Sequence, residues 1–125
     1  MKKTILFVED DQILRDMYNI KLNSAGFNTN PSEDGLQALD WLNDNLADLA
    51  IVDILLPKMN GLKLIKAIRK DPRHNNMRII ILTNLTESDV SLHDTVKESL
   101  GVDAYFVKSQ VSPRDLVDNI IKILE

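Results

Sequence analysis

The sequence contains no cysteine, which excludes disulfide bonds and any chemistry carried by a thiolate. It has no apolar stretch as long as a membrane span, and the Met-Lys-Lys start is not followed by the apolar segment of a signal peptide. Aromatic residues make up 5% of the chain and the net charge is −4, which argues against nucleic acid as a direct ligand. We therefore expect a cytoplasmic protein without membrane contact, folded as one domain over residues 1–125.

Four short apolar runs, rich in β-branched residues, predict strands that are buried on both faces of a parallel sheet. They span residues 5–8, 49–52, 79–82 and 104–107, and residues 27–30, just before Pro31, form a weaker fifth candidate. Strands separated by helical patterns predict right-handed crossovers. The expected fold is therefore α/β, with a doubly wound five-stranded parallel sheet and helices on both faces.

Apolar residues at helical spacing predict five helices. These residues are Ile13, Leu14, Met17, Tyr18 and Leu22 in the first helix, Leu36, Leu39 and Leu42 in the second, Leu62, Ile65 and Ile68 in the third, Val90, Val96 and Leu100 in the fourth, and Leu116, Ile120, Ile121 and Leu124 in the fifth. Gly26 and Gly101 would end the first and fourth helices. Ser112 as N-cap and Pro113 at the first helical position mark the start of the fifth.

Positive charge is concentrated in residues 58–78, which contain seven Lys or Arg and a single Asp. Such a segment either attracts an anionic partner or forms the solvated face of a helix. We favour the solvated face, because runs of charge on a helix usually face water.

Polar residues directly follow the predicted strands. Glu9, Asp10 and Asp11 come after the first strand, Asp53 after the third, and Thr83 and Lys108 after the fourth and fifth. In doubly wound sheets, ligands bind beyond the carboxyl ends of the strands, where the strand order reverses. We therefore expect these side chains to meet at one edge of the sheet.

The segment after the first strand has no glycine, although nucleotide- and flavin-binding folds of this class hold phosphate there with a glycine- or hydroxyl-rich loop. Its acids would repel phosphate unless a hard cation lies between them, and carboxylates suit Mg²⁺. Asp53 stands alone after a central strand, where its carboxylate can act as a nucleophile toward phosphorus. Lys108 would supply positive charge, and Thr83 a hydroxyl, for the transferred group.

Each of these residues has an ordinary explanation when it is taken alone. A Thr or Asp at a strand end is usually a turn or cap residue, and a lone Lys is usually a solvated charge. Five complementary roles at matching strand ends rarely coincide by chance, so we favour one joint site.

The chain resembles, over essentially its whole length, the receiver domain of two-component response regulators, and chemotaxis-regulator-like receivers in particular. The resemblance rests on Glu9-Asp10, on residues 53–61, which match the family's phosphorylation motif Asp-x-x-x-Pro-x-Met-x-Gly, on Thr83, and on residues 101–108. It implies a flavodoxin-like sheet with strand order 2-1-3-4-5. It also implies a signalling switch rather than an enzyme, with self-phosphotransfer and slow autodephosphorylation as its chemistry.

By this resemblance, Asp53 accepts a phosphoryl group from a histidine of a partner kinase or phosphotransfer protein. Asp10, Asp53 and the backbone carbonyl of Leu55 would bind Mg²⁺, or another divalent cation such as Mn²⁺, and Glu9 would assist, partly through water. Asp11 falls one position beyond the acid pair, and we interpret it as the N-cap of the first helix.

The resemblance also implies that Thr83 and Lys108 bind the phosphoryl group. In the family the threonine moves toward the phosphate and the aromatic residue, here Tyr105, turns inward, which reshapes the surface of the fourth helix and fifth strand. Without that role, Tyr105 would be a half-buried strand residue with its hydroxyl in water.

Three features depart from the family pattern. Ser109 stands where the family usually has a proline after a cis bond, and because a non-proline cis bond costs about 3–4 kcal/mol, we expect either a trans bond with a reshaped loop or a strained cis bond. Asn84 stands where the family usually has a smaller residue, which puts the lifetime of the phosphorylated state in question. The segment 83–108 is longer than usual, with the extra length within 86–90 or the helix that follows.

The first helix and the loop before Ser112 border the expected site and are the predicted docking face for the histidine kinase or phosphotransfer protein. Leu14 and Met17 are candidate contacts there or, equally, core residues. A homodimer through the fourth and fifth helices is a further hypothesis. We expect no effector domain in this chain, and a stand-alone receiver and a piece of a larger regulator both stay open.

The two alternative functions are a phosphohydrolase and a receiver-like module that only docks partners. A phosphohydrolase of the haloacid-dehalogenase type places its nucleophile after the first strand in an Asp-x-Asp-x-Thr context, which residues 9–13 do not match. A receiver-like protein that only docks partners would not need all five site residues. Phosphorylation by a small phosphodonor with Mg²⁺ separates the docking module from the switch, and a steady-state phosphatase assay separates the hydrolase from it.

Overall fold

The computed structural model describes residues 2–85 and 99–125. The elements are β1 (Thr4–Val8), α1 (Gln12–Ser24), β2 (Asn28–Ser32), α2 (Gly35–Asp44), β3 (Leu49–Val52), α3 (Gly61–Lys70), the 3-10 helix η1 (Pro72–His74), β4 (Arg78–Thr83), β5 (Ala104–Val107), the 3-10 helix η2 (Lys108–Gln110) and α5 (Pro113–Leu124). The five strands are parallel and lie in the order β2-β1-β3-β4-β5. The predicted fold class and strand order are therefore confirmed.

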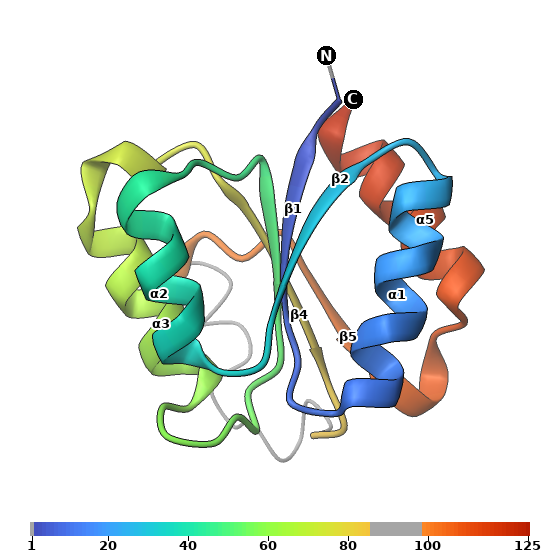
Figure 1. The fold of residues 1–125 in the computed structure, drawn as a ribbon, viewed down its shortest axis with the longest axis horizontal. Coiled ribbons are helices and arrows are strands. Elements are labelled where there is room, and N and C mark those ends of the chain that lie inside the picture. Colours follow the sequence, from blue (N-terminus) through green and yellow to red (C-terminus); the bar gives the residue numbers. More distant parts are fainter. Residues whose placement is uncertain (1, 86–98) are drawn as a thin grey trace.

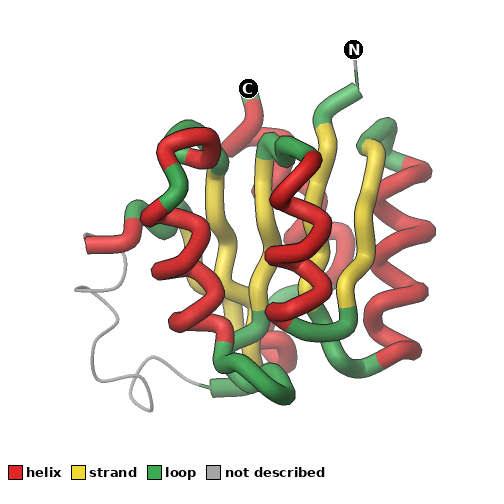
Figure 2. The backbone as a smooth tube through the Cα atoms, turned by 60° about the vertical axis from the view of Figure 1, so that its left-hand side comes forward, coloured by secondary structure: helices red, strands yellow, loops and turns green. Residues whose placement is uncertain are grey.

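The sheet forms the middle of three layers, with α2 and α3 on one face and α1 and α5 on the other (Figure 1). Figure 2 shows the strands enclosed between the helices. Because successive side chains of a strand point to opposite faces, Leu6 and Val8 pack on the side of α2 and α3, whereas Ile5 and Phe7 pack on the side of α1 and α5. Each fully buried Ile, Leu or Phe contributes about 1.5–3 kcal/mol, so both faces hold the sheet rigidly.

Side-chain caps fix where the helices begin. Asp11 accepts hydrogen bonds from Ile13 N and Leu14 N, as the sequence predicts for the N-cap of α1. The other N-caps with a side-chain bond are Asp34 for α2, Asn60 for α3 and Ser112 for α5. Three of these four helices begin beside the carboxyl ends of β1, β2 and β3, so the caps also set the shape of the loops there.

Strand β2 is the least apolar strand and lies at the edge of the sheet. It continues through Pro31 to Ser32, whereas the sequence predicts an end before the proline. Asn28 N donates to Lys3 O and Glu9 N donates to Ser32 O, so the backbone N–H and C=O groups of the even-numbered residues of β2 point toward β1. Pro31 therefore faces outward, where its missing N–H removes no bond of the sheet.

Some residues of the predicted apolar helix stripes lie at the surface. Ile13 is 83% exposed, Leu36 51% and Ile121 41%. The apolar stripes predicted for α1, α2 and α5 are thus too wide, because one covering sheet buries only part of a helix circumference. The predicted positions Val90 and Val96, and residues 86–90 as the place of extra length, lie outside the described residues.

The basic segment 58–78 divides into two groups. Lys63, Lys66 and Lys70 are exposed on α3, in agreement with the predicted solvated face. Arg69 instead donates to Leu100 O and Gly101 O, at 2.8 and 3.0 Å, and burial lowers the pKa of its guanidinium. Across the described residues, none of the helices has the length and apolar character that a membrane crossing requires.

Candidate functional site

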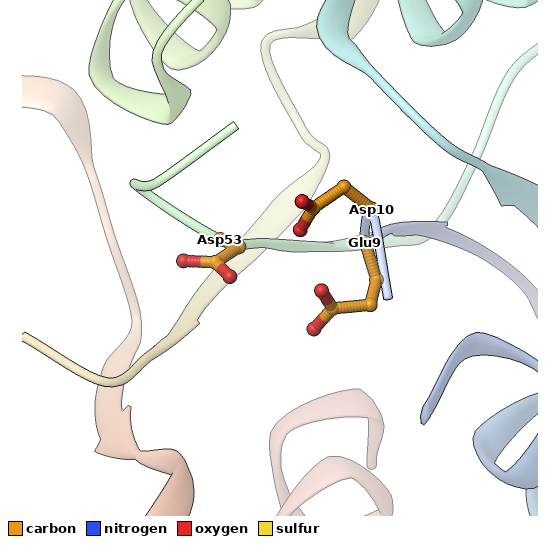
Figure 3. Close-up of side chains that lie close together, drawn as sticks. All are labelled: Glu9, Asp10 and Asp53. Carbon is orange, nitrogen blue, oxygen red and sulfur yellow. The ribbon is translucent and has the colours of Figure 1, made fainter. Parts of the chain in front are cut away.

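The carboxyl ends of β1 and β3 bring three acids together at one edge of the sheet. Glu9 and Asp10 follow β1, Asp53 follows β3, and their side chains point toward one another (Figure 3). One carboxylate oxygen from each lies within 4.8 Å of the others. Glu9 is 1% exposed and Asp53 4%, whereas Asp10 is exposed to solvent. Two of the three charges are therefore held in a buried setting.

Lys108 contacts both buried acids. Its Nζ lies 2.5 Å from Glu9 Oε1 and 2.6 Å from Asp53 Oδ2, and its side chain is 15% exposed. Burial would lower the pKa of Lys108, but the carboxylates of Asp53 and Glu9 outweigh it and raise that pKa. Burial raises the pKa of Glu9, although contact with Lys108 acts in the opposite direction. One ammonium thus serves two carboxylates, which leaves the cluster short of positive charge.

The turn after β1 is held by several hydrogen bonds. Asp11 N donates to Glu9 Oε2 at 3.1 Å, and Glu9 N donates to Ser32 O at 2.9 Å. Arg15 Nη1, from the first turns of α1, donates to the backbone carbonyl of Glu9 at 2.7 Å. The sequence analysis missed Arg15, because nothing in its spacing distinguishes it from a solvated helix residue.

The loop after Asp53 leaves no space for a side chain at Gly61. A Cβ built on Gly61 would lie 2.1 Å from Asp53 O, closer than any real contact, and Gly61 N donates to Ile54 O. Leu55 N donates to Asp53 Oδ1 at 3.0 Å, and Leu55 itself is 55% exposed. The start of α3 therefore packs directly on the backbone that carries the Asp53 carboxylate.

The same loop is fastened to the turn between β2 and α2. Lys58 adopts a φ of 67°, which is rare for a residue with a side chain, and its Nζ lies 3.4 Å from Asp34 Oδ2. Met59 packs on Gly35, where an added Cβ would lie 3.2 Å from the Met59 sulfur. These two contacts join the loop after β3 to the turn between β2 and α2, and nothing in the sequence predicts them.

Thr83 and Tyr105 meet at Leu85. Thr83 ends β4 and is fully buried, and its Oγ1 accepts a long hydrogen bond of 3.4 Å from Leu85 N. The Tyr105 hydroxyl donates to Leu85 O at 2.8 Å. Tyr105 is half-buried, as its alternative interpretation predicts, but its hydroxyl bonds to a carbonyl of the loop after β4.

The Lys108–Ser109 peptide is trans, since the described residues contain no cis bond, and Lys108 begins the short helix η2. This is one of the two outcomes expected for a chain without proline at position 109. The trans bond does not displace the ammonium, which reaches both Glu9 and Asp53. Asn84, the other departure in the described part, is exposed.

The donor set of Glu9, Asp10 and Asp53 fits a hard divalent cation. It consists of oxygen atoms alone, carries more negative charge than Lys108 compensates, and is open to solvent at Asp10. Mg²⁺ typically binds through one or two carboxylates and keeps several waters, which this half-open arrangement permits.

The chain is similar to known proteins over almost its whole length. The sequence profile of the response regulator receiver domain matches residues 5–121. The DNA-binding response regulator MtrA of Mycobacterium tuberculosis is 32% identical over 123 residues, which cover 96% of this chain and 50% of that protein. The phosphate regulon transcriptional regulatory protein PhoB of Pseudomonas aeruginosa is 32% identical over 122 residues, which cover 98% of this chain and 52% of that protein. The chain spans about half the length of these curated relatives.

Solved structures show the same fold. A CheY-like response regulator receiver domain protein from Methanospirillum hungatei superposes with a TM-score of 0.87 at 30% identity, over 99% of this chain and 94% of that chain. The chemotaxis response regulator CheY4 of Vibrio cholerae gives a TM-score of 0.87 at 24% identity, over 98% of this chain and 99% of that chain. The first match agrees with the sequence profile, and the second supports the fold alone.

Proposed function

The chain belongs to the family of response regulator receiver domains, which are signalling switches of two-component systems rather than enzymes in the usual sense, and on this premise we propose that Asp53 is its phosphoacceptor. The observation that carries the proposal is the buried Asp53 carboxylate, which lies 2.6 Å from Lys108 Nζ and beside two further acids. A nucleophile for phosphoryl transfer needs positive charge next to it, because charge develops on the oxygens of the transferred group.

In the proposed reaction, a carboxylate oxygen of Asp53 forms a bond to the phosphorus of a phosphohistidine. The P–N bond breaks as the P–O bond forms, the imidazole leaves with the electron pair of the P–N bond and takes up a proton, and an acyl phosphate remains on Asp53. Hydrolysis of that acyl phosphate by water would restore the carboxylate slowly.

The metal would be Mg²⁺, or Mn²⁺ in its place, held by Asp10, Asp53 and the backbone carbonyl of Leu55, with Glu9 assisting through water. Its chemistry is to neutralise the acids and the oxygens of the phosphoryl group. Lys108 would then exchange its contact with Asp53 for a phosphoryl oxygen, which its flexible stem permits.

Thr83 and Tyr105 would transmit the change. A phosphoryl group offers the Thr83 hydroxyl an acceptor for its proton, and movement of the side chain toward that group would break the long bond that Oγ1 accepts from Leu85 N. Because Leu85 O also holds the Tyr105 hydroxyl, a shift of Leu85 would alter the surface next to β5. The mechanism is a population shift driven by contacts that exist in the phosphorylated state alone.

The histidine kinase or phosphotransfer protein would dock on α1 and the loop before Ser112. Leu14 and Met17 are half-buried and pack on the core, whereas Ile13 and Ile20, seven residues apart on one face of α1, are 83% and 66% exposed. We therefore propose Ile13 and Ile20 as the principal contacts in place of Leu14 and Met17. Docking there would bring a phosphohistidine to the carboxyl ends of β1 and β3.

We further propose that this domain acts in the cytoplasm and does not bind DNA itself. Its net charge is −4, and Arg69, Arg73 and Arg78 of the basic segment are engaged with carbonyl and carboxylate oxygens. A homodimer through the fourth and fifth helices stays a prediction.

Phosphorylation by a small phosphodonor with Mg²⁺, read by intact mass, tests the proposal. We expect the wild-type protein to gain one phosphoryl group and Asp53→Asn to gain none. Asp44→Asn, which changes an exposed acid at the end of α2, is the matched control and should behave as the wild type. No gain in the wild type would favour a docking module, and rapid steady-state turnover of the phosphodonor would favour a phosphohydrolase.

A further inference from the structure

Arg15 connects α1 to the turn that carries two of the three clustered acids. Its Nη1 donates to the carbonyl of Glu9 at 2.7 Å, and the side chain is half-buried. That carbonyl belongs to the peptide group joining Glu9 to Asp10. Rotation of this peptide plane changes the direction of both neighbouring side chains, so a bond to its oxygen affects how the two carboxylates lie relative to each other.

The rest of the turn is fixed at other atoms. Glu9 N donates to Ser32 O, Glu9 Oε2 accepts from Asp11 N, and Glu9 Oε1 contacts Lys108. These contacts hold Glu9 on the β1 side of the peptide. Asp10, on the other side, is exposed, and its orientation depends on the peptide that precedes it.

We propose that Arg15 is a positioning residue, which holds the Glu9–Asp10 peptide so that the two carboxylates face the same cation. The inference rests on the proposed function, because it assumes that this cluster binds Mg²⁺. Arg15 does not itself contact the metal or the phosphoryl group in this assignment, and it acts through the backbone.

The charge of Arg15 makes the proposal testable. A guanidinium near a cation site repels the cation, so removal of the charge alone would tighten Mg²⁺ binding. Removal of the bond to Glu9 O would weaken it, because partners that orient metal ligands typically contribute 10-fold or more to metal affinity. The two effects have opposite signs, so the direction of the change distinguishes positioning from electrostatics.

The experiment is calorimetric titration of Mg²⁺ into the wild type, Arg15→Gln, Arg15→Lys and Lys21→Gln. Lys21 is an exposed cation of the same helix and serves as the charge control. We expect Kd to rise about 10-fold in Arg15→Gln, to rise less in Arg15→Lys, whose ammonium can still reach the carbonyl, and to stay near the wild-type value in Lys21→Gln. The melting temperature of each metal-free variant shows that the comparison is made on folded protein.

An unchanged or lower Kd in Arg15→Gln overturns the proposal, even if its melting temperature falls, because a purely structural role would lower stability and leave metal affinity intact. In that case the wild type still binds Mg²⁺ and the proposed function stands. A wild type that shows no Mg²⁺ binding overturns the proposed metal site and the role of Arg15 together.

Discussion

Acids lie at both ends of the parallel strands, which we call the amino-terminal and carboxyl-terminal edges. The acids at the amino-terminal edge accept hydrogen bonds from the backbone. Asp48 Oδ2 accepts from Thr4 N at 2.8 Å, and Asp103 Oδ2 accepts from Ile79 N at 2.9 Å. Asp103 Oδ1 also accepts from Arg78 at 3.1 Å. Each carboxylate there ties the beginning of one strand to a neighbouring segment and so stabilises the fold.

At the carboxyl-terminal edge the same residue types face one another. Glu9 and Asp53 share Lys108 as their basic partner among the described contacts, Asp10 lies beside them, and burial raises the pKa of Glu9. An acid at a strand end is therefore not in itself evidence of a functional site. What distinguishes the carboxyl-terminal edge is a surplus of negative charge in a buried place, which costs stability until a cation neutralises it.

The largest expected effect follows from removing the shared cation. Lys108→Met should lower the free energy of unfolding of the metal-free protein by about 3 kcal/mol, the low end for breaking a buried ion pair, because Lys108 is partly exposed. Saturating Mg²⁺ should recover much of this loss, as it replaces the missing charge. Denaturant unfolding with and without Mg²⁺ measures both, and Lys66→Met on the exposed face of α3 is the control. An equal loss in both conditions would contradict the idea that Lys108 stands in for a cation.

The amino-terminal edge should respond differently. Asp103→Ala leaves Ile79 N–H without its partner and removes the pair with Arg78, so we expect a loss of about 1.5–2 kcal/mol. Since this edge has no surplus charge, Mg²⁺ should not change the size of the loss. A dependence on Mg²⁺ in the same denaturation experiment would contradict this expectation and show that the two edges are coupled.

Glu9→Gln should raise the melting temperature of the metal-free protein at pH 7 by less than Asp103→Ala lowers it. The folded-state pKa of Glu9 is raised above its ordinary 4.5, so the protonated carboxyl group stabilises the fold more than the ionised one does. This stabilisation is lost as the pH rises through the folded-state pKa. The advantage of the variant should therefore disappear below about pH 4.5. Calorimetric scans from pH 4 to 8 measure it, and a variant less stable at pH 7 would show that the ion pair with Lys108 dominates.

The smallest effect is expected at Asp71, a partly exposed acid near the amino-terminal edge. Hydrogen bonds from Arg73 lower the pKa of Asp71 to about 2. The ionised form therefore favours folding above about pH 4, and this contribution is lost as the pH falls toward 2. The melting temperature of the wild type should exceed that of Asp71→Asn at pH 5, and the difference should shrink as the pH falls from about 4 toward about 2. A difference of constant size over this range would assign it to the hydrogen bond that Asp71 accepts from Arg73 N at the start of η1 rather than to charge.

The sequence predicts the fold well because the central strands are continuous apolar runs, and such runs have one stable place in a parallel sheet. It predicts β2 only as a weak candidate over residues 27–30, and the strand, which lies at the edge against β1, ends two residues later, at Ser32. It also includes Ile13 in the apolar stripe of α1, although Ile13 lies at the surface, because helical spacing does not reveal how much of a helix one sheet face covers.

For the site, the convergence of Glu9, Asp10, Asp53 and Lys108 follows from strand ends that meet at one edge, and the structure brings these residues together. Their roles in metal binding and phosphoryl transfer stay predictions. Contacts that depend on side-chain reach, such as Arg15 to the Glu9 carbonyl, cannot be predicted from spacing, since a long flexible side chain can reach several acceptors.

Pro31 on the outer side of β2 has a consequence for association between copies. A strand from another chain could continue the sheet only by forming a regular row of bonds with the outward N–H and C=O groups of β2, and the imino nitrogen of Pro31 interrupts that row. The β2 edge of the sheet is thus protected against strand addition by another copy and the aggregation that would follow. Pro31→Thr would restore the missing donor and, at high concentration, the tendency to polymerise.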